Sequence, residues 1–193
     1  MFDILLIKIF KHQIYLLFMK ILSLHCDFIK YKPLKKALRE PEKLSKEREG
    51  EIEVKNPLVI LTAIEKQDEQ NPAIIEQLVK EVKDIAKQVN AKDIVLYPYA
   101  HLSSSLSNPA FALKTLEGAE KSLVKDFKVS RAPFGYYKEF ELKVKGHPLS
   151  ELSREIKFDG KVKNVDEPID YKQLLKEISK SKLDSRELKE NDH

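Results

Sequence analysis

The feature that most constrains the fold is an amphipathic helix pattern placed between two apolar strand patterns. The run V-I-L-T-A-I, within residues 51–65, predicts a buried central strand. Apolar residues then recur at helical spacing over residues 74–89, after a start signal at Asn71 and Pro72. A second strand, I-V-L-Y-P-Y, follows and ends at Pro98. A strand, a helix and a strand in this order predict a crossover unit and a partly parallel sheet.

The rest of the pattern supports an α/β fold with one mixed sheet and two main helices. Residues 20–25 predict a first buried strand, and Asn-Pro at 108–109 predicts the start of a second helix. A short strand is expected from Phe127, before an alternating strand within residues 132–154. Residues 30–50 are crowded with Lys, Glu and Arg and broken by two prolines, which predicts a solvated, mobile connection.

Composition narrows the class of protein and of site. A chain of 193 residues, 42% of them hydrophobic, predicts one domain with an ordinary core. The net charge of +4 permits RNA binding without requiring it. The single cysteine, Cys26, excludes an internal disulfide and fits a reducing cytosol. Zinc motifs, GxGxxG and the P-loop pattern are absent from the sequence, so we expect no metal site, no cofactor and no ATP-dependent activation.

Two terminal segments stand apart from a domain over residues 19–157. Residues 1–18 are apolar but carry charges, which makes them a poor membrane span, and they lack a signal-peptide cleavage site. We interpret them as an N-terminal extension from a mis-assigned start codon, with a membrane-associating segment as the alternative. A start at Met19 predicts a cytoplasmic protein. Residues 158–193 read as a linker tail with one amphipathic helix at 171–181.

Residues 132–154 hold the strongest site candidates. A glycine-containing turn with Phe134 leads Lys138 into an alternating strand, where side chains are held more precisely than in free loops. A solvated edge lysine is the structural alternative. In a regular strand the side chain of Tyr137 points to the face opposite that of Lys138. The two residues can therefore serve one site only where the chain is distorted.

Three long motifs occur in order along the chain. They are M-K-I-L-S-L-H-C-D-F-I from Met19, Y-P-Y-A-H-L-S-S from Tyr97, and A-P-F-G-Y-Y-K followed by K-G-H-P-L-S-E-L-S-R within 132–154. Together they resemble the editing domain of archaeal threonyl-tRNA synthetase, over residues 19–157. The resemblance implies the D-aminoacyl-tRNA deacylase-like fold and hydrolysis of L-serine from tRNA specific for threonine. A hydrolytic step is warranted, because one methyl group in a pocket supplies roughly 1–3 kcal/mol of discrimination.

The resemblance also implies roles for particular side chains. Lys138 is expected to orient water or to stabilise the developing oxyanion. His101, in a polar loop beyond the second strand, is a candidate general base, because imidazole titrates near neutral pH; a loop-bracing histidine is the alternative. Glu151 is expected to position Lys138 or a water, with a plain ion pair as the alternative. Tyr137 completes the catalytic candidates, and the substrate-binding candidates are Pro98, Ala100, His25, Asp27 and Phe134.

The implied reaction is metal-independent and assisted by the terminal 2′-hydroxyl of the tRNA, so that the protein supplies mainly position and electrostatics. The expected partners are the acceptor end of tRNA(Thr) carrying serine, a threonyl-tRNA synthetase catalytic module, and a second copy of the chain in a homodimer. RNA contacts are expected from the basic residues of 30–48, through phosphate and ribose. Three other functions stay open: a D-aminoacyl-tRNA deacylase, a non-catalytic module that binds the acceptor end, and a scaffold for a synthetase.

Overall fold

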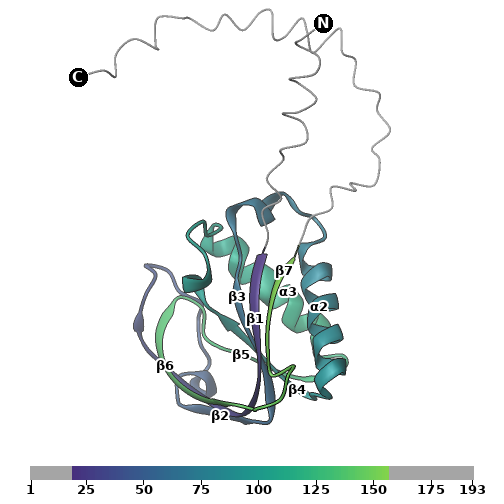
Figure 1. Cartoon of the computed structure of the whole chain (residues 1–193). Helices are drawn as coiled ribbons and strands as arrows, with labels where there is room; N and C mark the ends of the chain where they lie inside the picture. Colours follow the sequence, from purple (N-terminus) through teal and green to yellow (C-terminus); the bar gives the residue numbers. More distant parts are fainter. Residues whose placement is uncertain (1–18, 157–193) are drawn as a thin grey trace, which may run out of the picture. The chain divides into compact units, whose positions relative to one another are not determined.

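A single curled sheet dominates the computed structural model, which describes residues 19–156 (Figure 1). Within these residues the sheet has seven strands in the order β2-β1-β3-β4-β5, and both β6 and β7 pair with β1. The strands are β1 (Met19–Lys36), β2 (Ile52–Lys55), β3 (Pro57–Ala63), β4 (Asp93–Pro98), β5 (Lys128–Arg131), β6 (Tyr136–Val144) and β7 (Glu151–Ile156). The main helices are α2 (Ile74–Val89) and α3 (Pro109–Leu123), and the short 3-10 turns are η1 (Lys46–Arg48), η2 (Lys66–Gln70) and η3 (Ala100–Leu102). The predicted α/β class, with a mixed sheet and two main helices, is confirmed. The predictions for residues 1–18 and 158–193 lie outside the described residues.

Strand β1 changes partners along its length. Its first part pairs antiparallel with β3 and β7, and its second part pairs antiparallel with β2 and β6. Residues 30–36 therefore belong to a strand, and the prediction of a mobile connection over 30–50 is wrong for this part. Ile29 and Tyr31 are buried while Lys32 is exposed, so the charged run hides an alternating pattern with one apolar face.

The predicted crossover is present, and a second one follows it. Strands β3 and β4 pair in parallel through α2, and β4 and β5 pair in parallel through α3. Helix α2 begins at Ile74, slightly later than its predicted start. Helix α3 begins as predicted, because the Asn108 side chain accepts the Ala110 N–H at 2.8 Å and Pro109 occupies the first turn.

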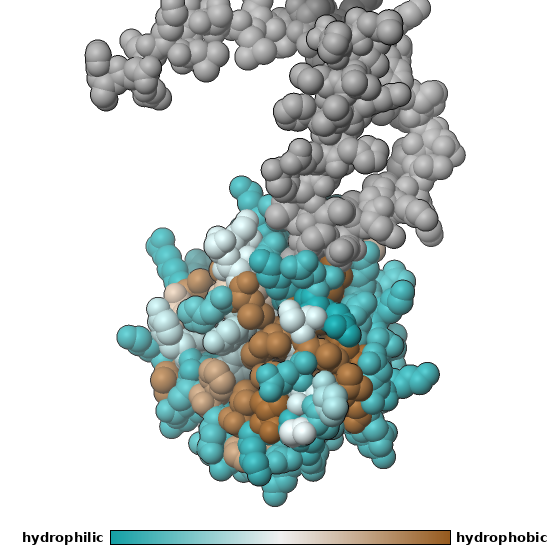
Figure 2. Space-filling model, viewed as in Figure 1, coloured by the Kyte–Doolittle hydropathy of each residue, from teal (hydrophilic) through white to brown (hydrophobic). Residues whose placement is uncertain are grey.

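Apolar clusters cover both faces of the sheet. Leu58 and Ile60 pack with α2 and α3 on one face, and Val59 and Leu61 pack on the other face, where β6 contributes partly buried side chains. Strand β3 is consequently buried along its whole length. Figure 2 shows apolar side chains in the middle of one face of the molecule, surrounded by hydrophilic ones. Among residues 19–156 there is no helix long and apolar enough to cross a membrane.

Candidate active site

A cavity of about 430 Å³ lies beyond the carboxyl ends of β3 and β4. Thr62 and Pro98 come from the ends of these strands, and residues 99–101 follow β4 directly. Residues 37–38, after β1, and residues 134–138, at the start of β6, complete much of the wall. We call this space the strand-end cavity. It lies at the edge where open α/β sheets usually bind ligands, and its mostly apolar wall with a few polar groups is typical of a small-molecule site.

Lys138 is the cationic side chain of this wall, and it is half-buried. Its Nζ donates hydrogen bonds to the carbonyl oxygens of Pro133 at 3.0 Å and Tyr136 at 3.1 Å. The same atom lies 5.2 Å from the ring centre of Tyr97. Burial lowers the pKa of the Lys138 amine to about 8, against the opposing effect of the charge on Glu42. The amine therefore changes charge close to neutral pH inside an apolar cavity, where a cation interacts strongly with a developing anion.

Other predicted residues line the same cavity. They are Pro98, Ala100, His101, Phe134 and Tyr137. Tyr137 and Lys138 both reach the wall although they are adjacent in the strand, and β1 carries a register irregularity over residues 33–36, opposite this point. His101 is exposed, with its ring packed edge-on against Tyr99 at a centroid distance of 5.3 Å. The geometry brings these residues together, and their individual roles stay predictions.

The loop that carries His101 is held by a buried carboxylate that the sequence analysis missed. Glu65, two residues beyond the end of β3, accepts a hydrogen bond from Ser103 Oγ at 2.6 Å and contacts Lys20 Nζ at 3.3 Å. The Leu106 backbone forms an isolated bridge with Glu65. The loop is thereby attached to the end of β3, which places His101 at the cavity.

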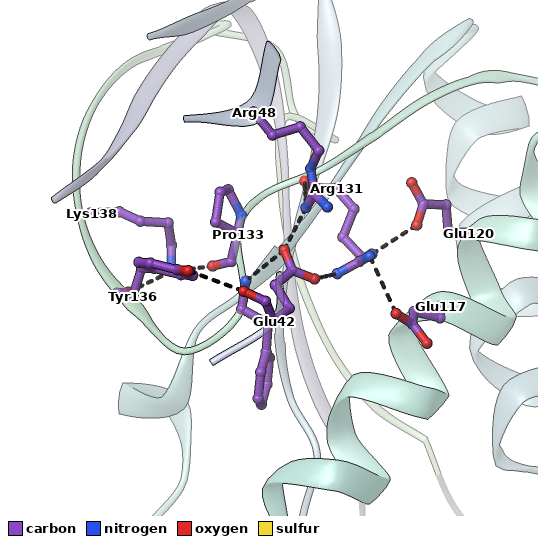
Figure 3. A network of polar contacts seen from close by, with 9 residues as sticks. Glu42, Arg48, Glu117, Glu120, Arg131, Pro133, Tyr136 and Lys138 are labelled. Atoms are coloured by element: carbon purple, nitrogen blue, oxygen red, sulfur yellow. Dashed lines mark hydrogen bonds and ion pairs between the residues drawn. The ribbon is translucent and has the colours of Figure 1, made fainter. Parts of the chain in front are cut away.

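A second missed carboxylate, Glu42, holds the opposite wall. It is buried, contacts Arg131 and Arg48, and accepts the Phe134 N–H at 3.1 Å (Figure 3). Its carbonyl oxygen accepts the Tyr136 hydroxyl at 3.0 Å. In the sequence this glutamate lies in a run of charged residues, where nothing distinguishes a buried carboxylate from solvated ones.

Three predicted site residues lie elsewhere. His25 pairs in register with Leu58, at the start of β3, whereas the strand-end cavity begins near Thr62. A strand rises about 3.3 Å per residue, so the separation along β3 is roughly 13 Å. Asp27 lies further along β1, and Glu151 is an exposed residue at the start of β7. His25, Asp27 and Glu151 are not among the residues that line the cavity, and their roles in the reaction stay predictions.

His25 and Asp27 belong to a separate polar group, which we call the far cluster: His25, Asp27, Lys143, Lys145 and His147. The Nδ1 atom of His25 lies 2.8 Å from Nε2 of His147. Asp27 contacts Lys145 at 2.7 Å and Lys143 at 3.2 Å, and these hydrogen bonds lower the pKa of its carboxyl. Burial, followed by the neighbouring His147 and Lys145, lowers the pKa of His25. Among residues 19–156, no group of three or more His, Cys, Asp or Glu side chains is arranged to hold a metal ion.

Residues 19–156, which build both the cavity and the far cluster, match the family model of the Archaea-specific editing domain of threonyl-tRNA synthetase. The chain belongs to this family. The threonine–tRNA ligase of Thermococcus onnurineus is 45% identical over 152 residues, and that of Methanobrevibacter smithii is 49% identical over 140 residues. These matches cover 77% and 72% of this chain but 24% and 23% of the two ligases. The chain thus spans about a quarter of the length of these relatives.

A solved structure shares the fold of this editing domain. The c-Myc DNA Unwinding Element Binding Protein superposes with a TM-score of 0.50 at 11% sequence identity, over 70% of this chain and 97% of that one. At this identity the likeness concerns the fold alone. The family recognised from the three sequence motifs is confirmed, as is the D-aminoacyl-tRNA deacylase-like fold class.

Proposed function

We propose that this editing domain hydrolyses the ester bond of seryl-tRNA(Thr) and releases serine. The observation that carries the proposal is the Lys138 amine in the apolar wall of the strand-end cavity, in a chain that belongs to an editing-domain family. Negative charge develops on the ester carbonyl oxygen as water adds to the carbonyl carbon. A cation held nearby in a cavity of low dielectric stabilises that charge more than it would in water.

The proposed reaction is a hydrolysis that does not use a metal ion. Water adds to the seryl carbonyl carbon, the carbon–oxygen bond to the ribose breaks, and the ribose oxygen leaves with a proton. The tRNA's own terminal 2′-hydroxyl assists the water, and the domain supplies position and electrostatics. His101 and Tyr137 are the other proposed catalytic groups at the cavity. Glu151 is proposed with them, although it lies outside the cavity wall, so a Glu151→Gln variant tests its role separately.

Substrate selection is proposed to occur at the walls near Pro98 and Ala100, where main-chain atoms contact the seryl group. A threonyl group carries one more methyl, which such a wall rejects by roughly 1–3 kcal/mol. The proposed partner is the tRNA(Thr) acceptor end, contacted in part by the basic residues of 30–48. The domain would act in the cytoplasm, within a threonyl-tRNA synthetase or in trans to one, and as a homodimer; analytical ultracentrifugation tests the last point.

The test is to incubate the full chain with seryl-tRNA(Thr), threonyl-tRNA(Thr) and a D-aminoacyl-tRNA and to follow loss of each ester. We expect release of serine with threonine spared. Replacing the terminal adenosine by 2′-deoxyadenosine is expected to slow the reaction, and 1,10-phenanthroline, which leaves Mg²⁺ for the tRNA, is expected to have no effect. Hydrolysis of the D-aminoacyl ester alone would point to a D-aminoacyl-tRNA deacylase. Binding without hydrolysis would point to an acceptor-end binding module, and no interaction with any tRNA would point to a scaffold.

A further inference from the structure

Glu42 differs from the other carboxylates around Arg131 because it also contacts the turn in front of β6, at the wall of the cavity. The Arg131 side chain is 6% exposed and also contacts Glu120 at 2.7 Å and Glu117 at 3.7 Å. Its positive charge is therefore compensated by other carboxylates besides Glu42. Glu42, whose side chain is 5% exposed, is the member of this group that also accepts the Phe134 N–H. It therefore links the buried charges to the turn in front of β6.

That link is made by several hydrogen bonds in a small space. Besides the Phe134 N–H bond to its carboxylate, the Glu42 N–H donates to the Phe134 carbonyl at 3.3 Å, and the Tyr136 hydroxyl donates to the Glu42 carbonyl at 3.0 Å. Gly135 lies between them with φ of 81°, and a Cβ added there would be 2.8 Å from Pro41 Cβ. The two segments approach so closely that a glycine is required at this point.

The same turn holds the Lys138 amine. The two carbonyl groups that accept hydrogen bonds from Nζ belong to Pro133, which precedes Phe134, and to Tyr136, whose hydroxyl donates to the Glu42 carbonyl. In Figure 3 the arginines lie on one side of Glu42, and Pro133, Tyr136 and Lys138 lie on the other. A displacement of the turn would move both acceptors of the amine, and a shift of about 1 Å at a reacting group is enough to cost roughly 100-fold in rate.

We infer that Glu42 is a positioning residue: by holding the turn at 133–136 it directs the Lys138 amine into the strand-end cavity. This inference rests on the proposed function. The charge of Glu42 adds a second effect, because it raises the pKa of Lys138 against the lowering by burial. The other titratable side chains that line the cavity are His101 and four tyrosines: Tyr97, whose ring centre lies 5.2 Å from the amine, Tyr99, Tyr136 and Tyr137.

The first measurement does not depend on any tRNA. The full chain is trace-labelled with acetic anhydride over a range of pH, and acetylation of each lysine is read by mass spectrometry. In Glu42→Gln, which keeps the shape and removes the charge, we expect the Lys138 midpoint to move to lower pH by roughly half a pH unit or more. Lys128, whose side chain is 83% exposed, is the internal reference in the same molecules and is expected to keep its midpoint.

The matched control is Glu117→Gln, which removes another carboxylate from Arg131 without touching the turn. It is expected to leave the Lys138 midpoint unchanged. In seryl-tRNA hydrolysis, Glu42→Gln is expected to lower kcat about tenfold or more with KM nearly constant. Glu42→Asp, which keeps the charge on a shorter side chain, is expected to restore the midpoint and only part of kcat.

Thermal unfolding accompanies each variant, because Glu42→Gln leaves two arginines with one carboxylate fewer. Should it fail to fold, Tyr136→Phe removes the hydrogen bond to the Glu42 carbonyl without exposing a charge. The turn is then held less firmly, so faster acetylation of Lys138 is expected. Equal Lys138 midpoints and rates in folded Glu42→Gln and Glu117→Gln would overturn the inference and leave the proposed function intact. A shifted midpoint in a domain that deacylates nothing would support the link and count against the proposed function.

Discussion

Lys138 and Lys145 lie toward opposite ends of the same sheet, and they differ in what they contact. In the strand-end cavity, the Lys138 amine donates to two neutral carbonyl groups and faces an aromatic ring. In the far cluster, Lys145 donates to the Asp27 carboxylate at 2.7 Å and to the Asn56 side chain at 3.0 Å. The pKa of Lys138 falls to about 8, while the charge of Lys145 helps to lower the pKa of Asp27.

The difference shows which feature marks a reactive amine. A lysine paired with a carboxylate has its charge neutralised by a protein group, so it stabilises the negative charge of a ligand only weakly. An amine with neutral partners at a cavity wall keeps a charge that no direct hydrogen-bond partner neutralises, and it is available to the negative charge of a transition state. Both ends contain histidines and acidic residues, so titratable groups alone do not identify the site.

The largest expected effect concerns stability at the cavity end. Arg131→Met leaves the buried carboxylate of Glu42 with Arg48 alone, and breaking a buried pair in this way is expected to cost about 3–5 kcal/mol of unfolding free energy. Lys143→Met breaks a surface contact, because the Lys143 side chain is 69% exposed, and is expected to change stability little. Urea unfolding of both variants measures the difference. Equal losses would contradict the distinction between the two ends.

The next effect is on catalysis. Lys138→Met is expected to lower the rate of seryl-tRNA hydrolysis by about 100- to 1,000-fold, as removal of an oxyanion donor does. It is not expected to reduce stability, because a half-buried amine is replaced by an apolar side chain of similar length. Lys145→Met, the matched change in the far cluster, is expected to keep the rate within about twofold. Single-turnover deacylation with both variants measures this. A large loss of rate for Lys145→Met would place the reaction at the far cluster and contradict its assignment to the strand-end cavity.

Local patterns predicted much of the fold. Helical spacing, strand alternation and the Asn-Pro start of α3 act over a few neighbouring residues, so the first crossover, both main helices and the position of the cavity followed from them. Strand direction does not have such a signal. His25 and Asp27 lie at the end of the first predicted strand and were candidates for the pocket wall, but β1 is antiparallel to β3, so this part of β1 lies toward the opposite end.

The burial of Glu42 and Glu65 could not be predicted from the sequence either. Glu42 lies in a segment that reads as solvated, and its burial depends on Arg131, which lies far away in sequence and is brought near by the crossover through α3. Glu65 is similar, because its partner Ser103 comes from the next strand's loop. The residues that position the site were therefore harder to find than those that line it, since their burial depends on long-range contacts.

A third expected effect separates two chemical roles of Lys138. If the ammonium form is active, kcat/KM falls as pH rises through about 8, because burial lowers the pKa of this amine to about 8 and deprotonation removes the charge. A rate that rises through the same range would instead make the neutral amine a general base. The ester also hydrolyses spontaneously, so a tRNA sample without protein is measured at each pH. Lys145→Met is expected to show the same profile as the unaltered domain.

The smallest effect belongs to the far cluster and appears in stability rather than rate. Burial and His147 lower the pKa of His25 in the folded state below its ordinary value of about 6.5, so the unfolded chain binds a proton first as pH falls. This part of the stability is complete above pH 6.5 and is lost as pH falls toward the folded pKa. His25→Gln is therefore expected to show a smaller decline of Tm between about pH 7 and pH 5.5. His101→Gln, at the cavity end, is the control and is expected to retain the full decline. If both variants behave alike, the histidine pair of the far cluster has no special part in acid stability.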